Sequence, residues 1–236
     1  MSRSTSATAR VARPNTRKGR RTRARVIEAG REVFARDGYV AARMSEVVAT
    51  AGLSTGGVYR YFQGKDDLLA AVIGDLHERL FAASRSHGLR FKSKPFEALL
   101  AANRGYLQLY AENAAVLAAL REAAAVKERF AAIWSAMRKR HVDRFRAAME
   151  RDFGVRDVNG IPVERLAEAL ACMTEQAAHV WFYESDASMR PSVEDAARVV
   201  THIWYRALFG SDGRGRVVGA GDHGRLGPAR NRWEEP

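Results

Sequence analysis

Residues 51–69, AGLSTGGVYRYFQGKDDLL, constrain the fold of this chain more than any other segment. Gly52 follows an apolar run, and a glycine there can take the left-handed conformation that ends one helix and lets the next begin at a steep angle. Leu53 can fill the corner, and the hydroxyl of Ser54 or Thr55 can accept a hydrogen bond from the free N–H groups of the new helix. The segment therefore predicts two helices that meet at a sharp corner.

The second of these helices, expected over residues 55–62, has two unlike faces. Val58 and Phe62 are four residues apart, so they share one face and are expected to pack inward. The outward positions are Thr55, Gly56, Tyr59 and Arg60. Gly56 and Gly57 each cost about 1 kcal/mol relative to alanine inside a helix, but they let the backbone come close to another surface. This combination is typical of a helix that lies in the major groove of DNA.

The same residues resemble the TetR family of transcriptional regulators. From Gly52 to Leu69 the chain matches the family pattern G-[LV]-S-x-G-x-x-Y-x-[YH]-F-x-x-K-[DE]-x-L-[LF] at every position, and the likeness begins near Thr22. The resemblance implies a three-helix domain over residues 22–84 whose partner is a double-stranded DNA operator. Its first two helices are expected over residues 22–37, with Gly38-Tyr39 as the stop, and over residues 45–51.

The resemblance also implies which side chains touch DNA. Base contacts fall on Thr55, Gly56, Gly57 and Tyr59, and phosphate contacts fall on Ser45, Tyr61 and Lys65. Ser54 joins them as the cap of a helix N-terminus, whose partial positive charge suits a phosphate or a base edge. Packing against the domain core is the alternative for Tyr59, Tyr61 and Lys65, and a solvated side chain is favoured for Arg60.

One position departs from the family pattern. The family usually places a threonine where this chain has Arg43, and that threonine forms a capping box with the acid three residues on, here Glu46. The helix cap is therefore weakened or moves to Ser45. Arg43 can replace the threonine as the donor to a phosphate.

The chain has a formal net charge of +12, and nearly all of the excess lies at its N-terminus. Residues 1–25 hold nine Lys and Arg and no acid. Residues 1–21 are expected to be a disordered basic arm, because they have too few large apolar side chains to form a core. Beside a DNA-binding domain this arm can follow phosphates or enter a minor groove. A transit peptide is a competing interpretation, and an effector-independent DNA-organising protein is the alternative function, since such an arm alone binds DNA.

Residues 85–209 are expected to form a second, all-helical domain. Helix starts are predicted at Pro95, Pro162 and Pro191, because proline is favoured at the first helical position. Further helices are expected over residues 112–125 and 127–153, the latter ended by Gly154, and Asn159-Gly160 predicts a turn. The whole chain is thus predicted to be all-α with about nine helices.

Parts of this second domain resemble the TetR branch that contains the ethionamide-resistance repressor. The matching segments are residues 133–135, 166–175, 191–194 and 202–204. The branch implies a long apolar effector cavity, and the corresponding positions here are Leu99, Ala102, Tyr106, Tyr110, Trp134, Thr174 and Trp204. Plain core packing is the alternative for these side chains. Because they offer no formal charge, a mainly apolar effector is favoured, such as an acyl or steroid-like compound or its coenzyme A thioester.

The same branch pairs its last two helices across a dimer interface. Apolar residues of this chain recur there at three- and four-residue spacing: Leu166, Leu170, Met173, Ala177, Val199, Ile203 and Ala207. A stripe of this width is typical of a four-helix interface between two copies. A homodimer is therefore expected.

Other residues and functions are less favoured by the sequence. His141 and His179 could orient a ligand carbonyl, although an ordinary interior or surface position is the better interpretation, and Cys172 is expected to be a small core residue. The six histidines have no zinc-binding spacing, and no cofactor or metal is expected. The chain has no G-x-S-x-G, H-E-x-x-H or P-loop motif, so no enzyme is predicted.

The N-terminal sequence and the lengths of the apolar runs indicate the expected cellular location. There is no secretory leader and no apolar run that could span a bilayer, so no membrane partner is expected. A cytoplasmic, nucleoid-associated regulator fits these features. The glycine-rich residues 210–236 are expected to be a flexible tail.

Overall fold

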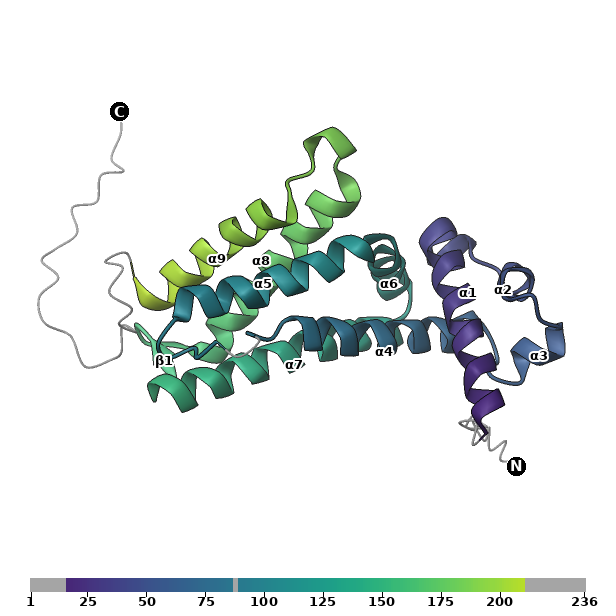
Figure 1. Ribbon diagram of the computed structural model, residues 1–236, viewed down its shortest axis with the longest axis horizontal. Helices are drawn as coiled ribbons and strands as arrows, with labels where there is room; N and C mark the ends of the chain where they lie inside the picture. The colour runs from purple at the N-terminus through teal and green to yellow at the C-terminus, as the bar shows by residue number, and fades with distance from the viewer. Residues whose placement is uncertain (1–15, 87–88, 211–236) are drawn as a thin grey trace, which may run out of the picture.

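The computed structural model describes residues 16–86 and 89–210, and within them it contains nine α-helices and one short hairpin. The helices are α1 (Arg17–Ala41), α2 (Met44–Ala51), α3 (Thr55–Tyr59), α4 (Lys65–Ala83), α5 (Pro95–Glu112), α6 (Ala114–Val126), α7 (Glu128–Phe153), α8 (Val163–His179) and α9 (Val193–Phe209). In Figure 1, α1, α2 and α3 gather at one end of the molecule, and α4 leads from them along its length. The predicted all-α architecture, with an N-terminal helix-turn-helix and a C-terminal helical domain, is confirmed.

Helix α1 begins earlier than the sequence predicted. Thr16 caps it by accepting a hydrogen bond from the backbone N–H of Gly19 (3.0 Å), so the helix includes Arg17–Arg21, which were assigned to a disordered arm. Residues 1–15 of that arm lie outside the described residues. Gly38 breaks the helix as expected, with φ 70°, but a short helical turn follows it and reaches Ala41.

The corner between α2 and α3 forms where the sequence predicted it. Gly52 is left-handed (φ 57°, ψ 42°), and Ser54 rather than Thr55 caps α3 by accepting from the N–H of Gly57 (3.2 Å). Helix α3 ends at Tyr59, three residues before the predicted end. Val58 and Phe62 are buried, so the inward face was predicted correctly.

The N-terminus of α2 lacks a side-chain cap. Arg43 stands at the cap position and makes no capping hydrogen bond, and the helix begins at Met44. The cap is therefore weakened, and it has not moved to Ser45.

Two of the three helix starts predicted at prolines are displaced by one or two residues. Pro95 begins α5 as expected, but Pro162 precedes α8, and Ser192 caps α9 by accepting from the N–H of Asp195 (3.0 Å), which leaves Pro191 outside the helix. Residues Asp157–Val158 (β1) and Ile161–Pro162 (β2) form an antiparallel pair that was not predicted. The turn between them is Asn159-Gly160, with φ 54° and 77°, and this conformation suits a two-residue hairpin.

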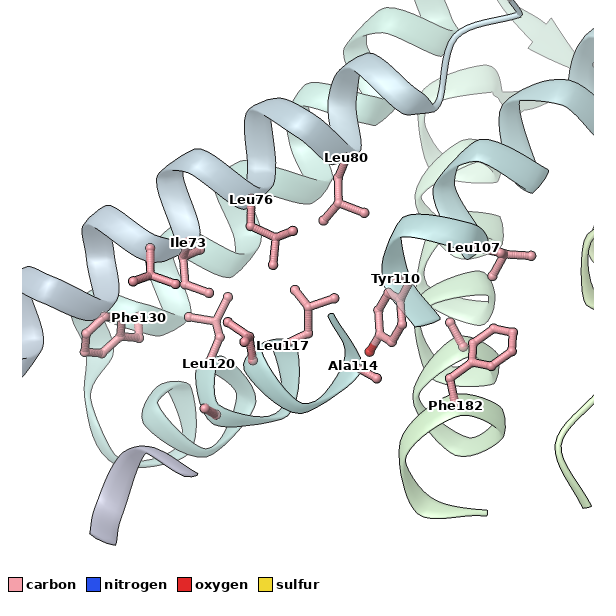
Figure 2. Packing of buried hydrophobic residues seen from close by; sticks show 14 of the residues in the cluster. Ile73, Leu76, Leu80, Leu107, Tyr110, Ala114, Leu117, Leu120, Phe130 and Phe182 are labelled. Atoms are coloured by element: carbon pink, nitrogen blue, oxygen red, sulfur yellow. The ribbon is translucent and has the colours of Figure 1, made fainter. Parts of the chain in front are cut away.

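Apolar packing between α4, α6 and α7 fills the middle of the molecule. Figure 2 shows Ile73, Leu76 and Leu80 of α4 facing α6, with Phe130 of α7 at one end of the cluster and Tyr110 of α5 at the other. All five are at most 2% exposed. Cys172, in contrast, is exposed on α8, so the prediction that it is a core residue is wrong. None of the helices within 16–86 and 89–210 is long and apolar enough to cross a membrane.

Helices α4 and α5 approach each other closely at Gly105. A Cβ atom placed there would overlap the carbonyl oxygen of Ala83, the last residue of α4. Since a backbone atom cannot turn aside as a flexible side chain can, only glycine allows the two helices to meet at this distance.

We expect Gly105→Ala to lower the free energy of unfolding by about 1–3 kcal/mol, because the ends of α4 and α5 must separate to admit the methyl group. Gly74→Ala is the matched control: Gly74 lies inside α4, and an added Cβ would meet nothing within 4 Å. That control should gain roughly 0.5–1 kcal/mol from helix propensity. Urea unfolding of both variants measures the difference, and a Gly105→Ala protein as stable as the parent would contradict the close approach.

Candidate functional site

The outward face of α3 is open to solvent. Tyr59 is 46% exposed, and Thr55, Gly56 and Arg60 are exposed beside it. An added Cβ at Gly56 would meet nothing within 4 Å, so the backbone of α3 is accessible at this position. The structure thus brings Thr55, Gly56 and Tyr59 together on one exposed surface, whereas Gly57, the fourth predicted base contact, is partly buried.

The predicted phosphate-contacting residues lie around this surface in different environments. Ser45 and Arg43 are exposed at the start of α2, where the first N–H groups of the helix are also free of side-chain caps. Tyr61 is partly buried and packs against the core of the domain. Ser54 is exposed, but its hydroxyl is engaged in capping α3.

Basic side chains of α1 include exposed residues and two that reach the α2–α3 corner and the segment that follows α3. Arg17, Lys18 and Arg21 are exposed in the first turns of this helix. The guanidinium of Arg25 reaches the carbonyl oxygen of Gly52 at the helix corner (3.4 Å), and that of Arg23 lies 5.2 Å from the ring centroid of Phe62. The sequence showed their charge, but their placement depends on α1 beginning at Arg17.

Lys65 has a structural role that the sequence did not predict. Its ammonium group donates to the carbonyl oxygens of Tyr39 (3.0 Å), Val40 (2.9 Å) and Ala42 (3.4 Å). An ammonium group has three N–H donors, and these bonds can use all of them. Lys65 therefore caps the short turn after Gly38, and its contact with a phosphate stays a prediction.

The backbone N–H groups of the same turn are bound by a side chain of the C-terminal domain. The carboxylate of Glu122 in α6 accepts hydrogen bonds from the backbone N–H of Tyr39 (2.6 Å) and of Val40 (3.2 Å). A positive-φ glycine at residue 38 is what turns both N–H groups toward α6. We call this set of contacts around Gly38 the junction.

Side chains at the start of α4 complete the junction. The hydroxyl of Tyr39 donates to Asp66 (2.7 Å), which also pairs with Lys127, and Arg129 pairs with Asp67 (3.2 Å). Burial and the hydrogen bond to Asp66 raise the pKa of Tyr39. Burial works against ionisation of Asp66, but the hydrogen bonds from Lys127 and Tyr39 outweigh it and lower the pKa of its carboxyl group. Lys127 and Arg129 at the N-terminal end of α7 thus hold the start of α4 through two ion pairs.

The C-terminal domain contains a cavity of about 710 Å³ between α5, α7, α8 and α9. Five of the seven predicted positions line it: Leu99, Ala102, Tyr106, Thr174 and Trp204. The other two, Tyr110 and Trp134, line a small separate void of about 20 Å³. Tyr106, His141 and Glu175 border both spaces, so these three side chains form the wall between them.

The polar side chains at the middle of the cavity mostly satisfy one another. The indole N–H of Trp204 donates to the hydroxyl of Thr174 (3.0 Å), which in turn donates to the carbonyl oxygen of Leu170 (2.8 Å). Asn103, which the sequence did not single out, donates to Thr201 (3.0 Å). This part of the wall therefore offers an apolar body mainly van der Waals contact.

The inner end of the cavity carries a charged pair, which contradicts the expectation of an uncharged wall. The carboxylate of Glu175 accepts from the guanidinium of Arg138 (2.7 Å) and from the indole N–H of Trp134 (3.2 Å). The side chain of Glu175 is 14% exposed and that of Arg138 is 23% exposed. The hydrogen bond to Glu175 raises the pKa of Arg138. Residues 37 positions apart in the chain meet here, so no local pattern could reveal the pair.

Two further ionisable groups line the cavity next to α4. Arg144 donates to the carbonyl oxygens of Phe81 (2.6 Å) and Ser84 (2.7 Å) at the end of that helix. Burial and the nearby charges of Arg85 and Arg140 lower the pKa of Arg144 to about 10. Burial and the charge of Arg144 lower the pKa of His141 to about 3, so His141 is neutral at pH 7. The Nδ1 atom of His141 lies 3.3 Å from the Ser84 hydroxyl. His179, the other histidine considered as a ligand contact from the sequence, does not line the cavity and lies beside Glu184.

Replacing Lys65 should lower the free energy of unfolding of the protein in the absence of DNA. We expect Lys65→Met to reduce the free energy of unfolding by about 1–3 kcal/mol, because three carbonyl oxygens lose a charged donor. Lys18→Met, at an exposed position of α1, should change it by less than about 0.5 kcal/mol. Urea unfolding measures both, and equal stability of the two variants would show that Lys65 is dispensable to the junction.

Comparisons with known proteins agree with this arrangement. Residues 26–72 match the family model "Bacterial regulatory proteins, tetR family", and residues 100–210 match the model "Transcriptional regulator EthR, C-terminal domain". Two curated relatives are similar over part of their length. The HTH-type regulator TtgW of Pseudomonas putida is 34% identical over 36% of this chain and 57% of its own, and UidR of Escherichia coli is 31% identical over 34% and 41%. The chain thus spans about half of these relatives' length.

Solved structures match over nearly their whole chains. A TetR-like regulator from Rhodococcus sp. RHA1 is 24% identical, covers 80% of this chain and 97% of its own, and has a TM-score of 0.60. A regulator of the TerR/AcrR family from Aquifex aeolicus is 19% identical over 78% and 99%, with a TM-score of 0.61. At these identities the structures show a shared fold. The two family models, together with the helix-turn-helix described above, assign this chain to the TetR family of bacterial regulatory proteins.

Proposed function

We propose that this regulator is a homodimeric repressor that binds a pseudo-palindromic operator and leaves it when a mainly apolar effector enters the cavity. Such a protein acts on the nucleoid, in the cytoplasm. The observation that carries the proposal is the placement of α4. Ser84, which ends this helix, lines the cavity, while Asp66 and Asp67 at its start hold Lys127 and Arg129 in the junction. One helix therefore joins the cavity wall to the domain that carries α3.

The effector and the operator would act on each other by linkage. An effector that fits the released dimer better than the operator-bound dimer weakens operator binding by the same factor by which the operator weakens effector binding. Inverting a bound population from 99:1 to 1:99 requires a preference of about 5.5 kcal/mol. Burial of a long apolar body against Leu99, Ala102 and Trp204 can supply energy of this size.

The charge of the inner wall does not change this preference for an apolar effector. Glu175 is already neutralised by Arg138 and hydrogen-bonded to Trp134. A cationic ligand would have to break that pair, and a half-broken buried pair leaves one charge without a partner. Mainly apolar compounds, such as acyl or steroid-like molecules or their coenzyme A thioesters, therefore remain favoured.

The face of α8 and α9 supports assembly of two copies. Val199 and Ile203 of α9 are 50% and 43% exposed, and Val180 and Tyr183, which directly follow α8, are 36% and 47% exposed. Leu170 of the predicted stripe is only 7% exposed, so it belongs to the core of its own chain. The remaining members, Leu166, Met173, Ala177 and Ala207, are partly buried. A second copy would remove these exposed apolar side chains from water.

Introducing a charge at this face should separate the copies. Sedimentation of the parent at micromolar concentration is expected to give about twice the chain mass of 26.2 kDa, and Ile203→Glu is expected to give a single mass and weak operator binding. Ile161→Glu, at a 48% exposed position of the hairpin, should stay dimeric. A monomeric parent that still protects a palindrome would overturn the dimer.

Recognition through α3 can be tested at Tyr59. We expect Tyr59→Ala to lose selectivity for the operator over unrelated DNA by roughly 1–3 kcal/mol for each lost base contact. Val126→Ala, an exposed residue of α6, should leave it unchanged. Footprinting measures both. Equal protection of the operator by Tyr59→Ala and parent would instead favour a DNA-organising protein that binds through basic side chains alone.

The effector class can be tested by blocking the cavity. Ala148 lines it, and its exposed neighbour Ala147 does not. We expect fatty acyl thioesters or sterol derivatives to release the parent from its operator and to change the fluorescence of Trp204, and we expect Ala148→Phe to abolish both effects while Ala147→Phe keeps them. Release by lipophilic cations alone, or unchanged release from Ala148→Phe, would contradict an apolar effector in this cavity.

A further inference from the structure

The cavity opens to solvent at an end that is built from arginines. Arg85 and Arg151 both line the cavity and are both exposed, so this end lies between the last residues of α4 and α7. Arg144 lines the wall behind them. Phe91, Phe145 and Trp204 continue the lining inward with aromatic rings, two of which are in contact with centroids 5.1 Å apart.

The connection between α4 and α5 strengthens the positive charge at this end. Residues 84–94 contain Arg85, Arg90, Lys92 and Lys94 and no Asp or Glu. Among the described residues, no hydrogen bond or ion pair joins Arg85, Arg90 or Lys92 to an acid. The nearby Asp152 is already bound by Arg151 at 2.9 Å.

The opposite end of the cavity has no such excess. Of the described residues that line the cavity, Glu175 is the only acid, and its charge is balanced by Arg138. The guanidinium of Arg144 is bound by carbonyl oxygens and by the Ser84 hydroxyl, which carry no formal charge to balance it. Positive charge is thus concentrated at the open end, next to an apolar interior.

We propose that this open end binds the anionic head group of an amphiphilic effector, a carboxylate or a phosphate, while the apolar body of the same molecule occupies the cavity. Arg85 contacts the head group with paired N–H donors, Arg151 contacts it through Nη1 alone because its Nε and Nη2 bind Asp152, and Arg144 adds to the positive potential behind it. Guanidinium groups suit this role because they bind carboxylate and phosphate oxygens with paired N–H donors. The inference rests on the proposed function, since it specifies the class of effector for the same cavity.

The test compares probes that share one twelve-carbon chain and differ in the head group. Dodecanoate, dodecyl phosphate and dodecanoyl coenzyme A are anionic, dodecanol is neutral, and dodecylammonium is cationic. Each is titrated into the full-length protein below its micellar concentration, with Trp204 fluorescence as the readout. We expect the anionic probes to bind about tenfold more tightly than dodecanol at low salt, and this advantage to shrink in 0.5 M salt.

Two variants locate the head group. Arg85→Gln is expected to remove most of the roughly tenfold advantage and leave dodecanol binding unchanged, and Arg85→Gln with Arg151→Gln removes the rest. Arg79→Gln is the matched control, because Arg79 is exposed on α4 and does not line the cavity. The ranking of dodecanoate against the two phosphorylated probes identifies which anion the site prefers.

The possible failures are distinguishable. If dodecanol and the anionic probes bind equally well, or if the double variant keeps the anionic advantage, the head-group site is overturned while the apolar-effector proposal stands. If no probe of any charge binds, the proposed function falls and this inference falls with it.

Discussion

The orientation of the two domains depends on how the backbone is held after Gly38. At that residue the chain leaves the helical conformation, and the following turn exposes N–H groups on one side and carbonyl oxygens on the other. Glu122 binds the N–H groups, and Lys65 binds the carbonyl oxygens. Each side chain has a charge opposite to the partial charge of the groups it binds, so the turn is fixed from both domains at once. These polar contacts add to the apolar packing of α1 against α4 and α6, which also joins the two domains.

The charge and polarity of the side chains that line the cavity change from one end to the other. Its inner end contains the balanced pair Glu175 and Arg138, its middle is apolar, and its outer end is cationic. Burial keeps His141 neutral, so the wall between the cavity and the small void behind it does not add charge at pH 7. A molecule with one apolar and one anionic part matches this order of environments better than a uniformly apolar molecule does.

Much of the fold was predictable because it depends on residues close together in the sequence. The left-handed Gly52, the Ser54 cap and the Gly154 helix end are decided by a few neighbouring residues. Both glycines were predicted at their places, and Ser54 was one of two residues predicted for the cap. The errors at Pro162 and Pro191 are also local. A proline before a helix satisfies the same preference as a proline in its first turn, and Ser192 is a better cap than Pro191.

The candidate sites were predictable where one helix face or a family resemblance decided them. Thr55 and Tyr59 are exposed because Val58, on the opposite face, is buried. The five cavity positions that were predicted correctly came from the resemblance to the ethionamide-resistance repressor branch. Lys65, Glu175 and Arg144 could not be assigned from the sequence, because their partners are 23 to 63 residues away. Cys172 was misplaced because an apolar helical context does not say which face meets the core.

The contact at Gly105 has a mechanical meaning. Side chains between packed helices can change rotamer and absorb a small displacement, whereas two backbones that touch directly cannot. Gly105 stands next to Tyr106, which lines the cavity, and it touches the last turn of α4 at Ala83. No side chain lies between the two backbones at this point that could absorb a displacement of the cavity wall at Tyr106. The absence of a side chain at one position thus puts the helix next to the cavity in direct backbone contact with the helix that begins in the DNA-binding domain.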